Sequence, residues 1–272
     1  WEPKNFDGKF EGPMRMRTAL VKSKNLVSIR ILQAIGIQYA QDYITRFGFD
    51  SSRHPPYLPM ALGSGSVTPM QMAVGYSVFA NGGYRIAPYF IKRIEDEKGN
   101  VLEQFQPITP LNGAKRVIDP RNAFIMTHMM QDVVNYGTAA KAKQLGRTDL
   151  AGKTGTTSNF VDAWFCGFQK DLVTVAWTGY DEPKSLGNNE TGGRIALPIW
   201  MDYMGPVLKG VPMAEYKPPN GILATKIDSA TGFRESAGDI NEYFFSEQLP
   251  PVSDTVVDHT PKVTKDLKDQ LF

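Results

Sequence analysis

The sequence has very little from which a metal centre or a covalent framework could be built. Cys166 is the single cysteine among 272 residues, so an intrachain disulfide and a cysteine-based zinc cluster are both excluded. The three histidines, His54, His128 and His259, are far apart in the sequence and do not have HExxH-type spacing. We therefore expect no metal site in this chain.

An excess of charge of one sign is also missing. The chain has 30 lysine and arginine residues against 28 aspartate and glutamate residues, a formal charge of +2, and no basic run. This balance excludes a nucleic-acid binder built on a broad basic surface. No uninterrupted apolar stretch reaches the roughly 18 residues of a membrane span, and no signal peptide opens the chain. Because Trp1 is not a natural start residue, we expect the chain to be a fragment of a longer protein.

The sequence does contain a clear series of helix and strand signals. With 42% hydrophobic residues, the chain can bury a globular core. Thr68, Pro69 and Gln71 combine a helix cap, a first-turn proline and a capping box, and Asp119-Pro120 repeats the first two signals. The expected helices end near Leu20, Gly36, Gly82, Gly137 and Leu208, and the expected strands are 149–157, 162–168 and 172–180, with a hairpin at 89–105 and weaker strands at 222–228 and 244–245.

This order of elements favours helices packed on both faces of an antiparallel sheet. The short polar link at 169–171 predicts that the strands before and after it pair antiparallel. From Pro250 onward the chain is polar and charged, which predicts a loose tail.

The first candidate for chemistry is the K-T-G cluster, Lys153-Thr154-Gly155, which Thr156 and Thr157 follow. A solvated strand end with a turn glycine is the alternative, but lysine is unusual in a strand among aromatic neighbours unless it has a partner. A strand edge can pair with an extended peptide, and Gly155 lets the ligand backbone approach closely. Lys153 and the hydroxyls of Thr154 and Thr156 suit a carboxylate, and a backbone N–H near Thr156 suits an oxyanion hole.

The second candidate is Ser23-Lys24-Asn25, the only S-x-N in the sequence. Serine and asparagine often do no more than cap helices, and for the motif by itself that alternative stays open. At a junction between two expected helices, however, a hydroxyl and an amide can protrude into a cleft.

Together the two motifs resemble the active-site signature of penicillin-binding proteins and serine β-lactamases. The flanking segments are more specific, and they closely resemble the transpeptidase domain of class A penicillin-binding proteins over about 1–251. These segments are GPMRMRTALVKSKNLVSIRIL (12–32), LGSGSVTPMQMAVGYSVFANGG (62–83), LAGKTGTTSNFVDAWFCGF (150–168), VTVAWTGYDEP (173–183) and GGRIALPIWMDYM (192–204).

The resemblance implies an α/β fold, a three-layer α/β/α sandwich around an antiparallel five-stranded sheet, incomplete here on its N-terminal side. It assigns 1–210 to the transpeptidase domain, 211–251 to C-terminal strands that complete or pack on that domain, and 252–272 to a polar tail. The parent protein is then expected to be a bifunctional peptidoglycan synthase, with a glycosyltransferase domain and a membrane anchor upstream of this chain.

The family's first motif, S-x-x-K, which holds the nucleophilic serine and its lysine, is missing. Every serine of the chain has a residue other than lysine three positions later. The nearest imitation, Thr138-Ala139-Ala140-Lys141, lies far from where the family places its nucleophile. Because S-x-x-K precedes S-x-N in the family, we expect it on an upstream segment of the same protein.

The resemblance further implies a peptidoglycan D,D-transpeptidase that cross-links stem peptides through a serine acyl-enzyme and that β-lactams trap as an ester. Ser23 would relay a proton towards the leaving amine, Lys153 would adjust its electrostatics, and Asn25 would hold the donor amide. No metal or organic cofactor is implied. The implied site residues are Ser23, Asn25 and Lys153 for catalysis and Thr154, Gly155, Thr156 and Thr157 for substrate binding.

Two other functions remain as alternatives at this point. A serine β-lactamase needs a water-activating residue such as a glutamate on a loop between the two motifs, and nothing between Asn25 and Lys153 resembles that loop. A non-catalytic module that binds cell-wall peptide would fit the missing S-x-x-K. The implied substrate places the enzyme at the periplasmic face of the bacterial inner membrane.

Two residues and one loop near the motifs are expected to play supporting roles. Asp162 is expected to make a structural hydrogen bond to the loop after Thr157. Cys166 is expected to be a buried, inert thiol. The glycine-rich loop at 187–193 is expected near the cleft.

Overall fold

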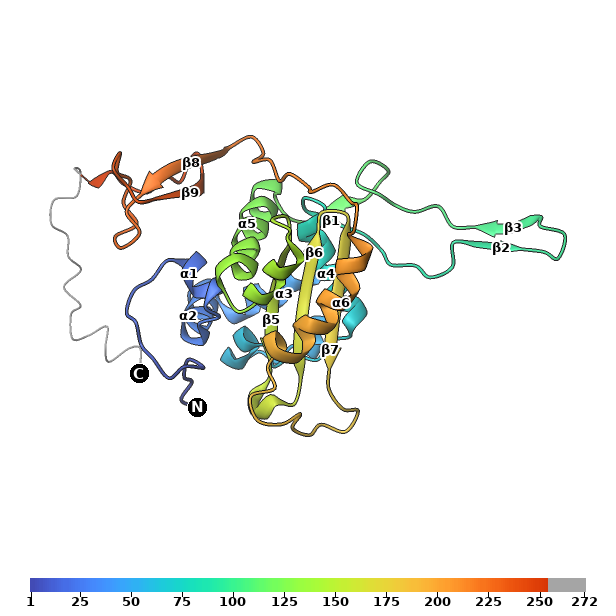
Figure 1. Cartoon of the computed structure of the whole chain (residues 1–272), viewed down its shortest axis with the longest axis horizontal. Coiled ribbons are helices and arrows are strands. Elements are labelled where there is room, and N and C mark those ends of the chain that lie inside the picture. Colours follow the sequence, from blue (N-terminus) through green and yellow to red (C-terminus); the bar gives the residue numbers. More distant parts are fainter. Residues whose placement is uncertain (254–272) are drawn as a thin grey trace. The chain divides into compact units, whose positions relative to one another are not determined.

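Small and aromatic residues build three central strands. β5 (Ala151–Thr156), β6 (Ala163–Gln169) and β7 (Leu172–Thr178) pair antiparallel in the order β5-β6-β7 (Figure 1). The register brings Gln169 opposite Leu172 at the turn, which confirms the pairing predicted across the polar link.

The sheet is incomplete, as the resemblance implies for this part of the domain. Three strands pair in it, instead of five, within the part of the chain that the structure describes. The remaining described strands form separate two-stranded antiparallel pairs. These pairs are β1 (Tyr84–Arg85) with β4 (Lys115–Arg116), β2 (Arg93–Glu95) with β3 (Val101–Gln104), and β8 (Ile222–Ile227) with β9 (Ile240–Phe245).

Helices cover both faces of the sheet, as the element order predicts. α6 (Leu197–Val207) packs on one face, and α4 (Pro69–Ala80) packs on the other. Tyr76 of α4 meets Phe168 of β6 edge-on, with ring centroids 6.4 Å apart. α5 (Pro120–Tyr136) lies along β5 (Figure 1).

The caps predicted for α4 and α5 are present. Thr68 Oγ1 accepts a hydrogen bond from Gln71 N at 3.1 Å, and Gln71 Oε1 accepts from Thr68 N at 2.8 Å. Asp119 Oδ1 accepts from Arg121 N at 2.8 Å at the start of α5. These bonds satisfy N–H groups that have no partner inside the helix, so each helix begins where its cap places it.

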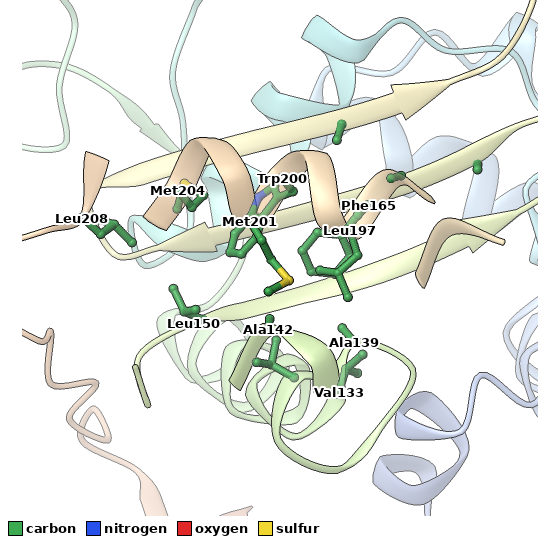
Figure 2. Close-up of a cluster of buried hydrophobic side chains, with 14 residues drawn as sticks. Val133, Ala139, Ala142, Leu150, Phe165, Leu197, Trp200, Met201, Met204 and Leu208 are labelled. Carbon is green, nitrogen blue, oxygen red and sulfur yellow. The ribbon is translucent and has the colours of Figure 1, made fainter. Parts of the chain in front are cut away.

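The main core lies between α6 and the sheet (Figure 2). Phe165 and Trp200 are fully buried and meet edge-to-face, with ring centroids 5.0 Å apart. Trp200 Nε1 donates to Thr174 O at 3.0 Å, so burial leaves the polar group of the indole satisfied. Gly167 is needed beside them, because an added Cβ would lie 2.7 Å from the Phe165 ring and 2.9 Å from Trp200.

Three short helices form the N-terminal part. α1 (Met16–Val21) and α2 (Asn25–Ile35) confirm the two predicted helices. The sequence does not predict α3 (Ile37–Ile44), because Gly36 is a typical stop signal. Gly36 has a φ of +88° and both ends α2 and precedes α3 directly, so the chain changes direction at a single residue.

The predicted hairpin at 89–105 is present as β2 and β3. Asp96 closes its turn, since Oδ1 accepts from Lys98 N and Asn100 N at 2.8 Å each. Every residue of both strands is exposed. Three 3₁₀ turns lie between α3 and α4, at Thr45–Phe47, Ser51–Arg53 and Leu58–Leu62.

The structure, a computed structural model, describes residues 1–253, and the chain divides into two units. The first, Trp1–Lys217, contains both motifs, and the second begins at Pro218, a few residues after the boundary predicted at 210/211. Most of the tail predicted at 252–272 lies outside the described residues. Within those residues, no helix is long and apolar enough to cross a membrane.

Candidate active site

Ser23 lies in the tight connection between α1 and α2. Its backbone has a φ of +53°, in the left-handed region that residues with a side chain rarely adopt. The turn is held by Ser23 N, which donates to Leu20 O at 3.1 Å, and by Lys24 N, which donates to Ala19 O at 2.9 Å. Non-glycine residues with this backbone cluster at functional sites, where the surrounding contacts hold them in place.

Lys153 on β5 reaches across to this connection. Its Nζ donates to Ser23 Oγ at 2.8 Å and to Thr154 O at 2.9 Å, and no carboxylate of the described residues pairs with it. Burial lowers the pKa of Lys153 to about 8, because an apolar environment disfavours the charged form. A lysine with this pKa is still mostly protonated at neutral pH, so Lys153 donates to Ser23 and places a positive charge beside it.

Cys166 lies opposite Lys153 in the β5–β6 register. Burial raises the pKa of its thiol to about 12, so the side chain stays a neutral thiol at ordinary pH. The structure therefore agrees with the expected inert cysteine, and the thiol supplies no counter-charge for Lys153.

The threonines of β5 each have a hydroxyl partner or a backbone partner. Thr154 Oγ1 lies 2.6 Å from Thr138 Oγ1, and Thr156 Oγ1 accepts from Gly192 N at 3.0 Å. Gly192 must be a glycine, because an added Cβ would lie 2.4 Å from Gly155 O. The glycine-rich loop thus packs directly on the K-T-G strand, as predicted.

The Thr157 side chain makes its hydrogen bonds to Asp162, in the loop after β5. Its Oγ1 accepts a hydrogen bond from Asp162 N at 2.7 Å, and it does not line the cavity described below. Asp162 Oδ1 in turn accepts from Trp177 Nε1 at 2.9 Å. These contacts agree with the structural hydrogen bond expected for Asp162, and they tie Thr157 into the loop after β5, while its substrate-binding role stays a prediction.

A cavity of about 600 Å³, here called the binding cavity, brings the two motifs together. Four predicted site residues line it, and Lys153 reaches it through Ser23. Gly155 does not line it, and its backbone lies against Gly192. The lining residues are Phe6, Lys22, Ser23, Asn25, Thr138, Lys141, Thr154, Thr156, Thr191, Gly193 and Arg194.

The N-terminal strap, residues 4–11, supports the S-x-N side of the cavity. Lys24 is 3% exposed, and its Nζ lies 2.6 Å from Asp7 Oδ2 and 3.4 Å from Glu11 Oε1. The hydrogen bond with Lys24 lowers the pKa of Asp7, and the bond with Asp7 raises the pKa of Lys24. Asn25 Nδ2 donates to Lys4 O at 2.9 Å. The strap therefore holds Lys24 and Asn25 in place.

Several lining residues could not be found from motifs. Thr138 and Lys141 have the spacing that imitates S-x-x-K, and the structure places both in the cavity wall, with Thr138 at Thr154. Phe6 belongs to neither of the two motifs. Its ring meets Phe160 edge-on at 6.5 Å. Arg194 comes directly after the glycine-rich loop predicted at 187–193. The glycines of that loop are therefore the one sequence signal that could have pointed to Arg194.

Comparison with known proteins identifies this arrangement. The family description "Penicillin binding protein transpeptidase domain" matches residues 1–204. The chain belongs to this family. The transpeptidase-domain relatives include penicillin-binding protein 1A of Neisseria lactamica, which is 54% identical over 82% of this chain, and that of Pseudomonas aeruginosa, which is 42% identical over 92%.

Solved transpeptidase-domain structures share the fold. The crystal structure of penicillin-binding protein 1A from Haemophilus influenzae covers 92% of this chain, with a TM-score of 0.87 and 33% identity. PonA1 of Mycobacterium tuberculosis covers 80%, with a TM-score of 0.66 and 26% identity. The chain spans 28% and 36% of the length of the two curated relatives above and 42% of the Haemophilus chain. The α/β fold class expected from the resemblance is thereby confirmed.

Proposed function

We propose that this chain forms two walls of the active site of a peptidoglycan D,D-transpeptidase. The observation that carries the proposal is the hydrogen bond of 2.8 Å between Lys153 Nζ and Ser23 Oγ, at a cavity that Thr154 and Thr156 also line. The sequence has no S-x-x-K, so the nucleophilic serine and its lysine come from another segment, upstream in the same protein.

The reaction consists of two acyl transfers. The serine oxygen of the S-x-x-K segment attacks the penultimate D-alanine carbonyl, and the bond from that carbonyl carbon to the terminal D-alanine nitrogen breaks. The serine proton passes to the S-x-x-K lysine, and Ser23 relays a proton to the leaving amine. An amine of a second stem peptide then attacks the ester, forms the cross-link and returns the proton to the serine oxygen.

The positions of the remaining groups support a proposed role in binding. Thr154 and Thr156 carry hydroxyls into the cavity and take the terminal carboxylate, while Asn25 takes the donor amide. β5 is an edge strand of its sheet in the described part of the chain, so an extended peptide can add beside it. Lys153 contributes a positive field at Ser23, and the site needs neither metal nor organic cofactor.

β-Lactams are proposed ligands of the same site. PonA1, 25% identical over 80% of this chain, has been solved in complex with penicillin V. A class A relative also suggests an additional glycosyltransferase activity, a membrane anchor and a periplasmic position at the inner membrane for the whole protein. The β-lactamase and the peptide-binding module remain the competing functions.

The intact mass before and after incubation with benzylpenicillin tests the proposal. We expect no adduct on the chain alone, and one stable penicillin adduct on a protein that joins the chain to its S-x-x-K segment. Ser23→Ala in that protein should slow adduct formation at least about 10-fold. An adduct on the chain alone would contradict the assignment, and rapid release of hydrolysed penicillin would favour the β-lactamase.

A further inference from the structure

The binding cavity carries more positive charge than one carboxylate needs. Lys22, Lys141 and Arg194 line it together with the threonines, and none of the described lining residues is acidic. Lys22 Nζ is already 3.2 Å from Glu11 Oε2. Arg194 Nε is 3.7 Å from Glu190 Oε2, a long contact on an arginine whose side chain is 61% exposed. Within the described residues, Lys141 has no ion pair.

We propose that Thr138, Lys141 and Arg194 form a second anion-binding subsite, which takes a peptide carboxylate in addition to the one at Thr154 and Thr156. This inference rests on the proposed function and names the class of its substrate: a peptide, as donor or as acceptor, with at least two carboxylates. The two segments that supply these residues, 138–141 and 191–194, are here called the basic wall.

The backbone of the basic wall is fixed by close contacts. Thr138 N donates to Val21 O at 3.4 Å, and Thr138 Oγ1 lies 2.6 Å from Thr154 Oγ1. An added Cβ at Gly193 would lie 2.7 Å from Thr138 O, so the two segments touch at a position that admits only glycine. Arg194 lies within a π-helical turn, Gly192–Ala196. Such turns are frequent at functional sites.

The side chains on this fixed backbone suit carboxylate recognition. Arginine presents a planar fork that binds a carboxylate with two hydrogen bonds, and lysine adds a mobile point charge. The Thr138 hydroxyl can accept or donate, because its contact with Thr154 leaves one direction open. One ligand carboxylate at Thr154 and Thr156 balances Lys153, so Lys141 and Arg194 remain available for a second.

The test uses matched ligands that differ by one carboxylate, with the chain joined to its S-x-x-K segment. The donor pair is acetyl-Glu-D-Ala-D-Ala and acetyl-Gln-D-Ala-D-Ala, compared by kcat/KM for D-alanine release. The acceptor pair is D-glutamate and D-glutamine, compared by the ratio of aminolysis to hydrolysis of the acyl-enzyme. The pair that shows a preference identifies which substrate occupies the subsite.

We expect a preference of about 3- to 10-fold for the carboxylate member in one pair, as partly exposed charge pairs give. Lys141→Gln and Arg194→Gln should each reduce it towards 1, and 0.5 M salt should do the same. Lys209→Gln, a charge change at an exposed site outside the cavity, should leave it unchanged.

The outcomes separate the two claims. Equal rates for both members of both pairs, in a protein that reacts with benzylpenicillin, would overturn the second subsite and leave the proposed function intact. A preference that persists in both variants would also overturn it. A protein that carries S-x-x-K and does not react with benzylpenicillin would overturn the proposed function, and the subsite with it.

Discussion

Ser23 combines an unfavourable backbone with a hydroxyl that faces Lys153. A left-handed backbone costs about 1–2 kcal/mol for a residue with a Cβ and nothing comparable for glycine. Ser23→Gly and Ser23→Ala both remove the hydroxyl, but Ser23→Ala keeps the strain. We therefore predict that the glycine variant is more stable than the alanine variant by about 1 kcal/mol, measured as the free energy of unfolding in urea.

Both Ser23 variants should lose reaction with benzylpenicillin to a similar extent when joined to S-x-x-K. Activity depends on the hydroxyl, whereas stability depends on the backbone, so the two readouts should separate. A glycine variant that is less stable than the alanine variant would show that the turn at Ser23 is unstrained.

Lys153 is destabilising in its buried position. Its pKa falls from 10.5 in the unfolded chain to about 8 in the fold, because burial disfavours the ammonium form. Between these values the unfolded state binds a proton that the native state does not, so stability rises with pH across this window. Below pH 8, burying the charged lysine lowers the free energy of unfolding by the full amount, about 3 kcal/mol.

We predict that Lys153→Met raises the free energy of unfolding by about 2 kcal/mol at pH 7, after the loss of two hydrogen bonds is subtracted. The gain over wild type should shrink as the pH rises from 8 to 10. Urea unfolding at pH 7 and pH 10 measures it, with Lys209→Met at an exposed position as the control. A destabilised variant at pH 7 would indicate that the lysine is stabilised by its contacts.

The two motifs predict which of their own residues meet at one cavity better than they predict the rest of its wall. Ser23, Asn25, Thr154 and Thr156 line one cavity as expected, because each belongs to a recognisable motif. Thr138 meets Thr154 only through the packing of the segment after α5 on β5. No local pattern records such a contact.

At the scale of elements, the N-terminal strap holds the S-x-N motif through ion pairs. Hydrogen bonding to Lys24 lowers the pKa of Asp7, and hydrogen bonding to Lys22 lowers the pKa of Glu11. A carboxyl group with a lowered pKa stabilises the fold above its unfolded pKa, and the stabilisation is lost as the pH falls through its folded pKa. The strap should therefore loosen in acid, below about pH 4.

We predict that Asp7→Asn speeds amide hydrogen exchange in residues 4–11 and at Leu26, whose N–H donates to Asn5 Oδ1 at 3.1 Å. Exchange in β6 should not change, since the strap makes no ladder bond there. Hydrogen exchange followed by mass spectrometry measures both regions. Glu95→Gln, which removes the ion pair with Arg93 on the exposed hairpin, is the matched control. Equal exchange in the Asp7 variant and wild type would mean that the strap is held by backbone contacts alone.

Elements were predictable where a single local signal decides them. The caps at Thr68 and Asp119 fix α4 and α5, and the three-residue link fixes the β6–β7 turn. The sequence did not predict α3, because Gly36 has the same sequence signature whether the helical region ends there or only changes direction into another helix. The resemblance implies five strands for the complete domain and an incomplete sheet in this chain, and three strands pair in the described residues.

At the scale of the whole molecule, a buried ion pair holds residues 208–214 at the C-terminal end of the first unit. Arg147 Nη2 lies 2.6 Å from Asp149 Oδ2, and Asp149 is 1% exposed. Burial opposes ionisation of Asp149, but hydrogen bonds from Arg147 and Ala214 N outweigh it and lower the pKa. Arg147 also donates to the carbonyl oxygens of Leu208, Val211 and Pro212. Residues 208–214 therefore belong to the first unit, although they follow its last helix.

This buried ion pair predicts where the chain can be shortened. A chain of residues 1–217 keeps every contact of Arg147 and Asp149, and it ends where the second unit begins. We expect it to unfold within a few degrees of the full chain's first transition. A chain of residues 1–207 loses the Ala214 N–Asp149 bond of 2.8 Å and the three carbonyl acceptors of Arg147. Its free energy of unfolding should fall by about 3 kcal/mol or more, because the remaining charges stay buried with fewer partners.

Thermal unfolding of the three chains, followed by circular dichroism, distinguishes the alternatives. If 1–217 were as unstable as 1–207, the second unit would contribute to the stability of the first, and the boundary at Lys217 would be wrong. If 1–207 were as stable as the full chain, water would satisfy Arg147 and Asp149, and the segment 208–214 would be a linker. The expected order places the end of the first unit just after Tyr216. Tyr216 is the last residue along the chain that contacts Asp149, and its hydroxyl donates to Asp149 O at 3.3 Å.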